Sequence, residues 1–324
     1  METISIKLKR SLLEGTRSLR YFGWRVTFAK LRCIWQNDSL ESVAAKNRVV
    51  LQYLEKMARP LLDKYTGENQ QQRDTTEATS APIWVLWWQG REKMPDIIRL
   101  CLASKEASAG AHPIILLTKE NIEQYVDFPD TIWEQFREGR IRIQHLADMI
   151  RVRLIRTYGG LWLDASIFCH DQIPERAFNS ELFTLKGKKD PRFVSENRWT
   201  TFVIGGLKDN VLCSFLDDFF MMYCQTGKPF VDYFQFDCAI ALAYFNIPAV
   251  NKQIDLLPQE KGDCYWLNEV LKWRADEELI TKMQDEPSVI YKIGWSSLLE
   301  KPAEESLYAK LLTEFGLENT HEKG

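Results

Sequence analysis

Two runs of consecutive apolar residues, separated by a helical pattern, constrain the fold of this chain more than any other feature. The first run, Ile83-Trp-Val-Leu-Trp-Trp88, is closed by Gln89-Gly90, and the second is Pro113-Ile-Ile-Leu-Leu-Thr118. Between them, apolar residues recur at helical spacing after Pro95. Strands that are apolar on both faces are typical of parallel sheets, whose connections place helices over each face. The sequence therefore predicts an α/β fold built on a parallel sheet.

Further elements continue this pattern along the chain. The stretch from His145 to Tyr158 predicts a helix, and Gly159-Gly160 is a typical stop signal for it. Next, Leu161-Trp-Leu-Asp-Ala-Ser-Ile-Phe168 predicts one strand with an acid in its middle. We also expect a short helix near residue 121, strands at 182–186 and 200–204, and helices over 210–224, 236–245 and 265–280.

Composition divides the chain into three regions. Residues 1–65 predict a basic helical extension, whose second helix begins near Asp38 and Glu41, spaced as in a capping box, and ends near Pro60. Residues 66–81 predict a polar linker, since large apolar residues are absent from 66–80. Residues 82–324 would then form the α/β domain.

Charge is distributed unevenly over these regions. The whole chain has 42 Lys and Arg against 45 Asp and Glu, so it lacks the basic excess of a typical nucleic-acid binder, and no nucleic-acid partner is expected. Residues 1–35, however, carry eight basic and two acidic side chains. Their apolar residues recur at helical spacing: Leu8, Leu12, Leu19, Phe22 and Val26. Such a segment could lie on an anionic membrane surface, or it could pack on the body through its apolar stripe.

Cysteines and hydropathy indicate the compartment. The seven cysteines are odd in number and contain no Cys-x-x-Cys pair, which favours reduced thiols over disulfides or a zinc site. No apolar run approaches the ~18 residues that a membrane span needs, and the N-terminus lacks the pattern of a secretory signal. We therefore expect a cytoplasmic protein, at most peripheral on the inner face of the cell membrane.

The segment around residues 145–166 carries the clearest chemical signal. Asp148 and Arg151 lie three residues apart on the predicted helix and so project from neighbouring positions. Asp164 interrupts apolar residues, where an acid is costly unless a cation or donor meets it. Singly, these residues could be a surface ion pair and a turn acid. Together they could hold a divalent metal and, through it, a diphosphate.

The pattern Asp148-x-x-Arg151, followed by Tyr158-Gly-Gly-Leu-Trp-Leu-Asp-Ala-Ser166, resembles the sugar-nucleotide site of glycosyltransferase family 32. More closely, it is similar to the bacterial capsular polysaccharide synthesis branch of that family. The resemblance covers roughly residues 82–300 and includes the run 83–90 with Pro95, Asp232-Tyr-Phe-Gln-Phe-Asp237, and Tyr291-Lys-Ile-Gly-Trp295.

This resemblance implies a GT-A fold, which is a Rossmann-like mixed sheet flanked by helices, here with the N-terminal helical extension. It implies that Asp148 and Arg151 hold the donor sugar and that Asp164 is the first acid of the family's DxD metal motif. The strand from Trp84 to Trp88, with Gln89, would border the nucleotide base. Trp295 and Ser296 would close over the diphosphate.

One position departs from the DxD pattern. Ser166 stands where the second acid is expected, which removes one negative charge from the metal site for Mn²⁺ or Mg²⁺. Asp237 and Asp232 are candidates for touching the sugar or the acceptor, although acids at a helix N-terminus are an equal alternative. No carboxylate can be identified as a nucleophile, and a front-face mechanism needs none.

The resemblance implies a retaining glycosyltransferase that moves a hexose from a nucleotide sugar, UDP-glucose or UDP-galactose, to an undecaprenyl-diphosphate-linked saccharide. Two alternatives stay open. The chain could be a non-catalytic nucleotide- or glycan-binding subunit that retained the fold, or a protein-modifying glycosyltransferase effector.

Overall fold

A mixed five-stranded sheet lies at the centre of the molecule. The structure, a computed structural model, describes residues 4–67, 81–300 and 302–317. Its helices are α1 (Ile4–Phe22), α2 (Trp24–Trp35), α3 (Leu40–Gly67), α4 (Asp96–Ser108), α5 (Asp130–Arg137), α6 (Ile143–Tyr158), α7 (Arg176–Asn179), α8 (Val211–Gln225), α9 (Gln235–Asn246), α10 (Pro248–Leu256), α11 (Trp266–Val270), α12 (Glu277–Asp285) and α13 (Leu307–Glu314). The short 3-10 turns are η1 (Arg91–Lys93), η2 (Ile122–Gln124) and η3 (Trp295–Ser297).

The strands are β1 (Ile83–Leu86), β2 (Ile114–Leu117), β3 (Gly160–Leu163), β4 (Ile167–Cys169), β5 (Phe183–Thr184), β6 (Val203–Gly206) and β7 (Ile290–Lys292). The central sheet has the order β2-β1-β3-β6-β5. Strand β1 pairs in parallel with β2 and β3, whereas β6 is antiparallel to both β3 and β5. The predicted α/β class, with a mixed sheet flanked by helices, is therefore confirmed.

The order of the strands creates a crevice. From β1 the chain passes through α4 to β2 on one side, and then through α6 to β3 on the other side of β1. The connections thus diverge between β1 and β3. In open α/β sheets such a switch point is where ligands bind, beyond the carboxyl ends of the strands.

The predicted strand 161–168 is wrong in one respect, because the structure divides it. Strand β3 ends at Leu163, residues 164–166 form a turn, and β4 pairs with β7 in a separate two-stranded sheet. Asp164 is therefore a turn residue at the end of β3, and there its carboxylate can leave the sheet. The predicted helix over 265–280 is likewise replaced by α11 and α12, which flank a turn.

The glycine pair before β3 is required by close backbone packing. Gly159 and Gly160 have φ values of +71° and +94°. A Cβ atom on Gly160 would lie 2.2 Å from the carbonyl oxygen of Pro82, the residue that precedes β1. Gly160 therefore lets the end of α6 turn directly into a strand beside β1.

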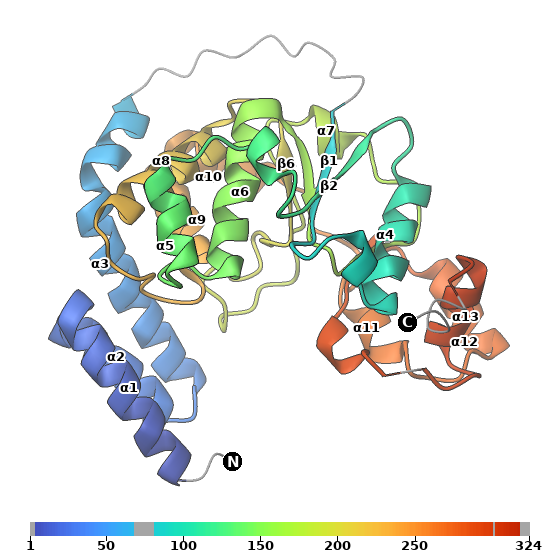
Figure 1. Cartoon of the computed structure of the whole chain (residues 1–324), viewed down its shortest axis with the longest axis horizontal. Helices are drawn as coiled ribbons and strands as arrows, with labels where there is room; N and C mark the ends of the chain where they lie inside the picture. Colours follow the sequence, from blue (N-terminus) through green and yellow to red (C-terminus); the bar gives the residue numbers. More distant parts are fainter. Residues whose placement is uncertain (1–3, 68–80, 301, 318–324) are drawn as a thin grey trace.

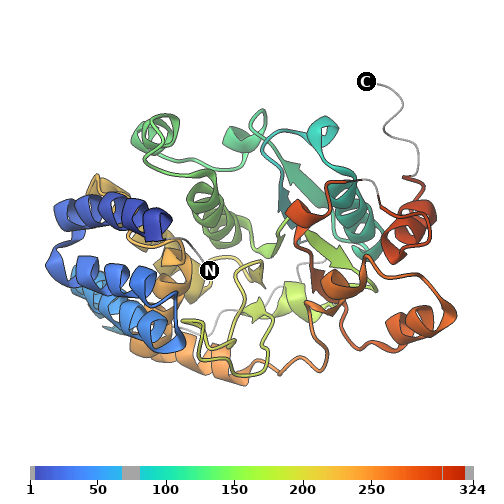
Figure 2. The same ribbon diagram turned by 90° about the horizontal axis from the view of Figure 1, so that it is seen from below.

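The N-terminal helices pack on one side of the sheet domain, and α11–α13 lie on the opposite side (Figures 1 and 2). Helix α3 packs on α8 and α9, α2 packs on α3, and α1 packs on α2. Val50, Leu54 and Leu62 of α3 belong to the same buried cluster as residues of α6, α8 and α9. The extension is thus joined to the main core.

Two details of this region differ from the sequence predictions. Helix α3 continues past Pro60 to Gly67. At its start the backbone N–H of Ser42 meets the hydroxyl of Ser39, while Asp38 is in a left-handed conformation, so Ser39 has the role predicted for Asp38. Most of the predicted linker, residues 68–80, lies outside the described residues. Among the described helices, none is long and apolar enough to cross a membrane.

Candidate functional site

A cavity of about 580 Å³ opens at the switch point between β1 and β3. Its walls come from the ends of β1 and β3, one face of α6, the segment before β6, the start of α9, and β7 with the turn that follows it. The predicted site residues that line it are Trp88, Gln89, Asp148, Arg151, Asp164, Ser166, Asp237 and Trp295. Residues separated by more than 200 positions in sequence therefore meet at one place.

Arg151 links the first two predicted acids. Helix α6 places Asp148 one turn before Arg151, so both side chains project towards the cavity. The other faces of α6 are buried against α8 and the sheet. The guanidinium lies 3.1 Å from Asp148 Oδ1 and 3.6 Å from Asp164 Oδ1. It also donates to the carbonyl of Thr201. Arg151 is thereby fixed between the two carboxylates.

The two carboxylates differ in protonation because their neighbours differ. Burial raises the pKa of Asp148 to about 7, against the opposing effect of Arg151. Burial would also raise the pKa of Asp164, but Lys292 and Arg151 hold it below its usual value, and Trp162 Nε1 donates to its Oδ1 at 2.9 Å. Asp164 therefore stays ionised at neutral pH, whereas Asp148 can exchange a proton near pH 7.

Asp237 is a third acid on the cavity wall, at the start of α9. Burial raises its pKa to about 6, and the indole of Trp199 donates to its Oδ1 at 3.2 Å. The other candidate of that segment, Asp232, lies elsewhere, because its carboxylate forms a 2.9 Å ion pair with Lys46 of α3. Asp237 therefore lies in this cavity, in the first turn of a helix, whereas Asp232 lies outside the cavity lining.

Lys292 of β7 occupies the position between the two predicted metal ligands. Its Nζ lies 2.7 Å from Asp164 Oδ2 and 3.0 Å from Ser166 Oγ. Fully buried Lys105 of α4 donates to the carbonyl of Ala165 at 2.9 Å and so holds the turn that carries both. The ammonium of Lys292 therefore already neutralises the carboxylate of Asp164.

The described residues do not fit a resident divalent metal. They contain no group of three or more His, Cys, Asp or Glu side chains arranged to hold one. An ion at Asp164 and Ser166 would have to displace the ammonium of Lys292, and the remaining donors would be one carboxylate and one hydroxyl. The expectation of Mn²⁺ or Mg²⁺ stays a prediction.

Aromatic residues border the cavity, but not all of those predicted. Trp88 lies beside it, and Trp87 meets Trp295 edge to face at 5.7 Å between ring centroids. Trp84 does not reach it, because it lies near the beginning of β1, fully buried, and donates to the carbonyl of Gly159. Ser296 follows Trp295 in η3 and is exposed, outside the cavity lining.

Sequence reasoning missed Lys292 and Trp87. The signal for Lys292 was present as a lysine between buried Tyr291 and Ile293, an alternation typical of a strand with one polar face. Nothing in the sequence pairs that strand with residues 167–169, however. The sequence places Trp87 in the apolar run without a separate role. In the structure β1 ends at Leu86, and Trp87 follows it and contacts Trp295.

Fold and site together describe an α/β protein with an acid- and cation-lined cavity at the switch point of its sheet. A family model described as capsular polysaccharide synthesis protein matches residues 31–311, a range that contains every residue of this cavity. The chain belongs to the capsular polysaccharide synthesis protein family.

Two individual proteins are also similar to this chain. The O-glycosyltransferase braB of Annulohypoxylon truncatum is 26% identical over 106 residues, which are 30% of this chain and 25% of that protein. The alignment thus spans a quarter of that relative's length. A solved structure, the PaToxG glycosyltransferase, covers 64% of this chain and 82% of its own, with 13% identity and a TM-score of 0.39.

Proposed function

We propose that this protein is a retaining glycosyltransferase of GT-A type that transfers a hexose from a nucleotide sugar, UDP-glucose or UDP-galactose, to a lipid-linked saccharide. The observation that carries the proposal is the meeting of Asp148, Arg151, Asp164 and Lys292 in one cavity at the switch point. Membership of the capsular polysaccharide synthesis family supports a role in glycan assembly. The similarity to the O-glycosyltransferase braB also supports a transferase.

The reaction requires opposite charges to be stabilised at two points. As the bond between the anomeric carbon and the diphosphate oxygen breaks, the electron pair leaves with the nucleoside diphosphate, and positive charge develops on the sugar. Lys292 and Arg151 stabilise the departing anion, and Asp148 and Asp237 stabilise the oxocarbenium-like centre. In a front-face transfer the acceptor hydroxyl bonds to the anomeric carbon and passes its proton to the departing phosphate oxygen.

The remaining side chains would hold the donor. Trp88 and Gln89 follow the end of β1, where a base can stack, and Trp295 packs on the neighbouring Trp87. Arg151 and Asp148 are both available to hydrogen-bond sugar hydroxyls, because each keeps atoms that face the cavity. The proposed donor therefore has its base, diphosphate and sugar along one path across the carboxyl edge of the sheet.

The proposed acceptor is an undecaprenyl-diphosphate-linked saccharide at the cytoplasmic face of the cell membrane. This part is supported by α1 and α2, whose exposed apolar side chains include Leu12, Leu19, Trp24 and Phe28. These helices also carry the basic excess of residues 1–35. Apolar and basic side chains together favour an anionic lipid surface.

A donor-hydrolysis screen tests the proposal. The purified full chain is incubated with a panel of nucleotide sugars, in Mn²⁺ and in a chelator, and free nucleoside diphosphate is measured. We expect hydrolysis of one or two UDP-hexoses, and at least a 100-fold loss in Asp164→Ala and Arg151→Ala, since removal of one charged transition-state contact costs about 2.7–4 kcal/mol.

Asp285→Ala is the matched control, because Asp285 is an exposed aspartate at the end of α12. It should hydrolyse the donor as the wild type does. Binding of UDP without hydrolysis of any nucleotide sugar would instead identify a non-catalytic binding subunit. Full activity of Asp164→Ala with an unchanged circular dichroism spectrum would refute the assigned site.

A further inference from the structure

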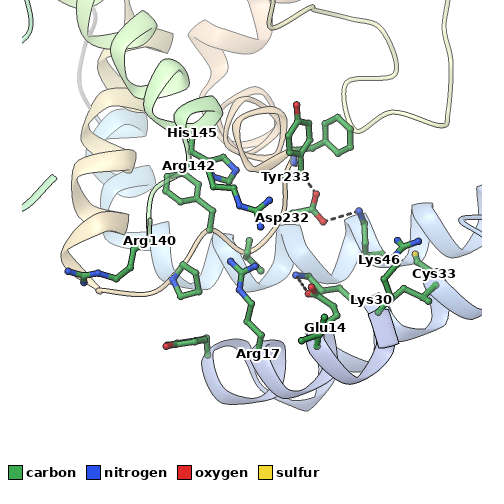
Figure 3. Close-up of a pocket in the computed structure, with 18 of the residues that line it drawn as sticks. Glu14, Arg17, Lys30, Cys33, Lys46, Arg140, Arg142, His145, Asp232 and Tyr233 are labelled. Atoms are coloured by element: carbon green, nitrogen blue, oxygen red, sulfur yellow. Dashed lines mark hydrogen bonds and ion pairs between the residues drawn. The ribbon is translucent and has the colours of Figure 1, made fainter. Parts of the chain in front are cut away.

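A second cavity, of about 820 Å³, lies between the N-terminal helices and the sheet domain (Figure 3). It is formed by α1, α2, the start of α3, the segment before α6, and the loop between α8 and α9. Neither the family match nor the proposed donor site assigns a role to it. Its charged lining residues are Arg10, Glu14, Arg17, Lys30, Asp38, Lys46, Arg140, Arg142 and Asp232.

Positive charge exceeds negative charge in this cavity. Two of its lysines are already paired, Lys30 with Glu14 at 2.6 Å and Lys46 with Asp232 at 2.9 Å. Arg17 of α1 and Arg142, the residue before α6, both point into the cavity (Figure 3), and among the described residues neither forms an ion pair. Two guanidinium groups that converge from separate elements repel each other unless an anion lies between them.

A buried histidine in the same wall lacks partners. His145 is 6% exposed and stacks on Phe230, with ring centroids 4.1 Å apart. Within the described residues neither ring nitrogen has a hydrogen-bond partner of normal geometry. Burial and the nearby Arg142 lower the pKa of His145 to about 4, so the ring is neutral and carries one N–H donor at neutral pH. Both ring nitrogens are enclosed beside the backbone of Asp232 and Tyr233, so a ligand oxygen would reach this donor only where that loop shifts.

The second cavity adjoins the proposed donor site. Tyr233 and Phe234 line both cavities. The same loop carries Asp232 into the second cavity and leads to Asp237 in the donor cavity. Residues 232–237 therefore form a shared wall, and a ligand bound on one side could extend past Tyr233 and Phe234 to the other.

We propose that the second cavity binds the diphosphate of a prenyl-diphosphate-linked acceptor, between Arg17 and Arg142 and beside His145. The acceptor sugar would extend past Tyr233 to the donor cavity, and the lipid would leave towards the exposed apolar side chains of α1 and α2. Guanidinium groups suit a diphosphate because they donate in pairs to its oxygens. This inference rests on the proposed glycosyl transfer.

The test is calorimetric titration of the full chain with farnesyl diphosphate, in the presence of saturating UDP so that the donor cavity is occupied. We expect Arg17→Glu/Arg142→Glu to lose at least tenfold in affinity. The matched control is Arg20→Glu/Arg137→Glu, which makes the same charge change on α1 and α5 at exposed positions outside the cavity lining. It should change affinity less than twofold.

Further measurements separate the possible failures. If the double glutamate variant does not fold, Arg17→Gln/Arg142→Gln replaces it, because this variant introduces no negative charge. It should also weaken farnesyl diphosphate binding. Inorganic pyrophosphate should bind more weakly than farnesyl diphosphate, and equal affinity would show a site for free phosphate and overturn the lipid assignment. Equal binding of farnesyl diphosphate by all variants would overturn the site itself. If the wild type does not bind UDP, that result would instead count against the proposed function.

Discussion

One lysine and one arginine oppose the carboxylates of the donor cavity. Asp164 contacts Lys292 at 2.7 Å and lies 3.6 Å from Arg151, which also holds Asp148. Positive charge is therefore present in the chain at the place where a metal motif would recruit an ion. Because a diphosphate needs such charge whatever its source, Lys292 has the most direct effect on how the site would bind its donor.

Replacement of Lys292 tests whether it takes the position of a metal ion. In a chelator, Lys292→Ala should bind UDP about 10-fold to 100-fold more weakly than the wild type, since a hydrogen bond to a charged group contributes about 1.5–3 kcal/mol. With Mn²⁺ the variant should recover affinity, because Asp164 and Ser166 then face an open position. Calorimetric titration with UDP measures both effects.

Lys188→Ala serves as the control for this experiment, because that lysine is exposed and distant from β7 in the sequence. It should bind UDP as the wild type does, with or without Mn²⁺. If the wild type binds UDP only in the presence of Mn²⁺, Lys292 does not take the place of an ion, and the metal site predicted from the sequence is correct.

Asp237 makes a separate prediction about pH. Its pKa in the folded protein is about 6, raised by burial from 3.8. Below about pH 4 the carboxyl is protonated in both states, and between pH 4 and 6 only the unfolded state ionises, so ionisation favours unfolding as the pH rises. The free energy of unfolding of Asp237→Asn, relative to that of the wild type, should therefore rise from pH 4 to 6 by at most about 3 kcal/mol. Above pH 6 this difference should stay constant.

Urea unfolding at pH 4.5 and pH 7.5 measures the difference. Asp218→Asn provides a comparison of opposite sign: burial raises the pKa of Asp218, but hydrogen bonds from Arg156 and Tyr65 hold it below its usual value. That variant should lose stability at neutral pH and lose less as the pH falls below about 4. A pH-independent difference for Asp237→Asn would show that its carboxyl is not shifted.

At the scale of elements, local patterns predicted much of the sheet and its helices, but not how distant segments meet. The runs at 83–88 and 113–118 became β1 and β2 because their apolar residues leave few alternatives. Residues 161–168 were predicted as one strand because Asp164 was the one charged residue in an apolar run, yet the chain turns there. The pairing of β4 with β7 joins residues more than 100 positions apart, so Lys292 could not be placed from sequence.

The turn from α6 into β3 gives a prediction for an element. Gly160→Ala should lose more than about 2 kcal/mol of stability, because its Cβ would lie 2.2 Å from a backbone oxygen that cannot move without shifting β1. Gly139 also has a positive φ, of +72°, but no heavy atom lies within 4 Å of where its Cβ would be. Gly139→Ala should therefore lose only about 1–2 kcal/mol of stability. Urea unfolding compares the two, and equal losses would contradict the packing argument.

For the whole molecule, near-neutral charge is an average of unlike parts. Residues 1–35 have a net charge of +6, and α1 and α2 lie at one side of the molecule, away from α11–α13 (Figures 1 and 2). Part of their apolar stripe is packed, since Phe22 and Val26 join the core, while Leu12 and Leu19 remain exposed. Packing on the body is thus confirmed for part of the stripe, and membrane contact by the exposed residues stays a prediction.

Vesicle binding tests that surface directly. The full chain should float with phosphatidylglycerol vesicles and not with phosphatidylcholine vesicles, and binding should fall as salt rises above about 0.1 M, where charges are screened beyond about 10 Å. Trp24→Ser/Phe28→Ser should weaken binding at least tenfold, since each buried aromatic contributes on the order of 2 kcal/mol. Phe245→Ser/Trp273→Ser removes two aromatics that are similarly exposed, on α9 and after α11, and should leave binding unchanged. Equal loss in both pairs would mean that exposed aromatics in general, and not α1 and α2, bring the protein to the lipid.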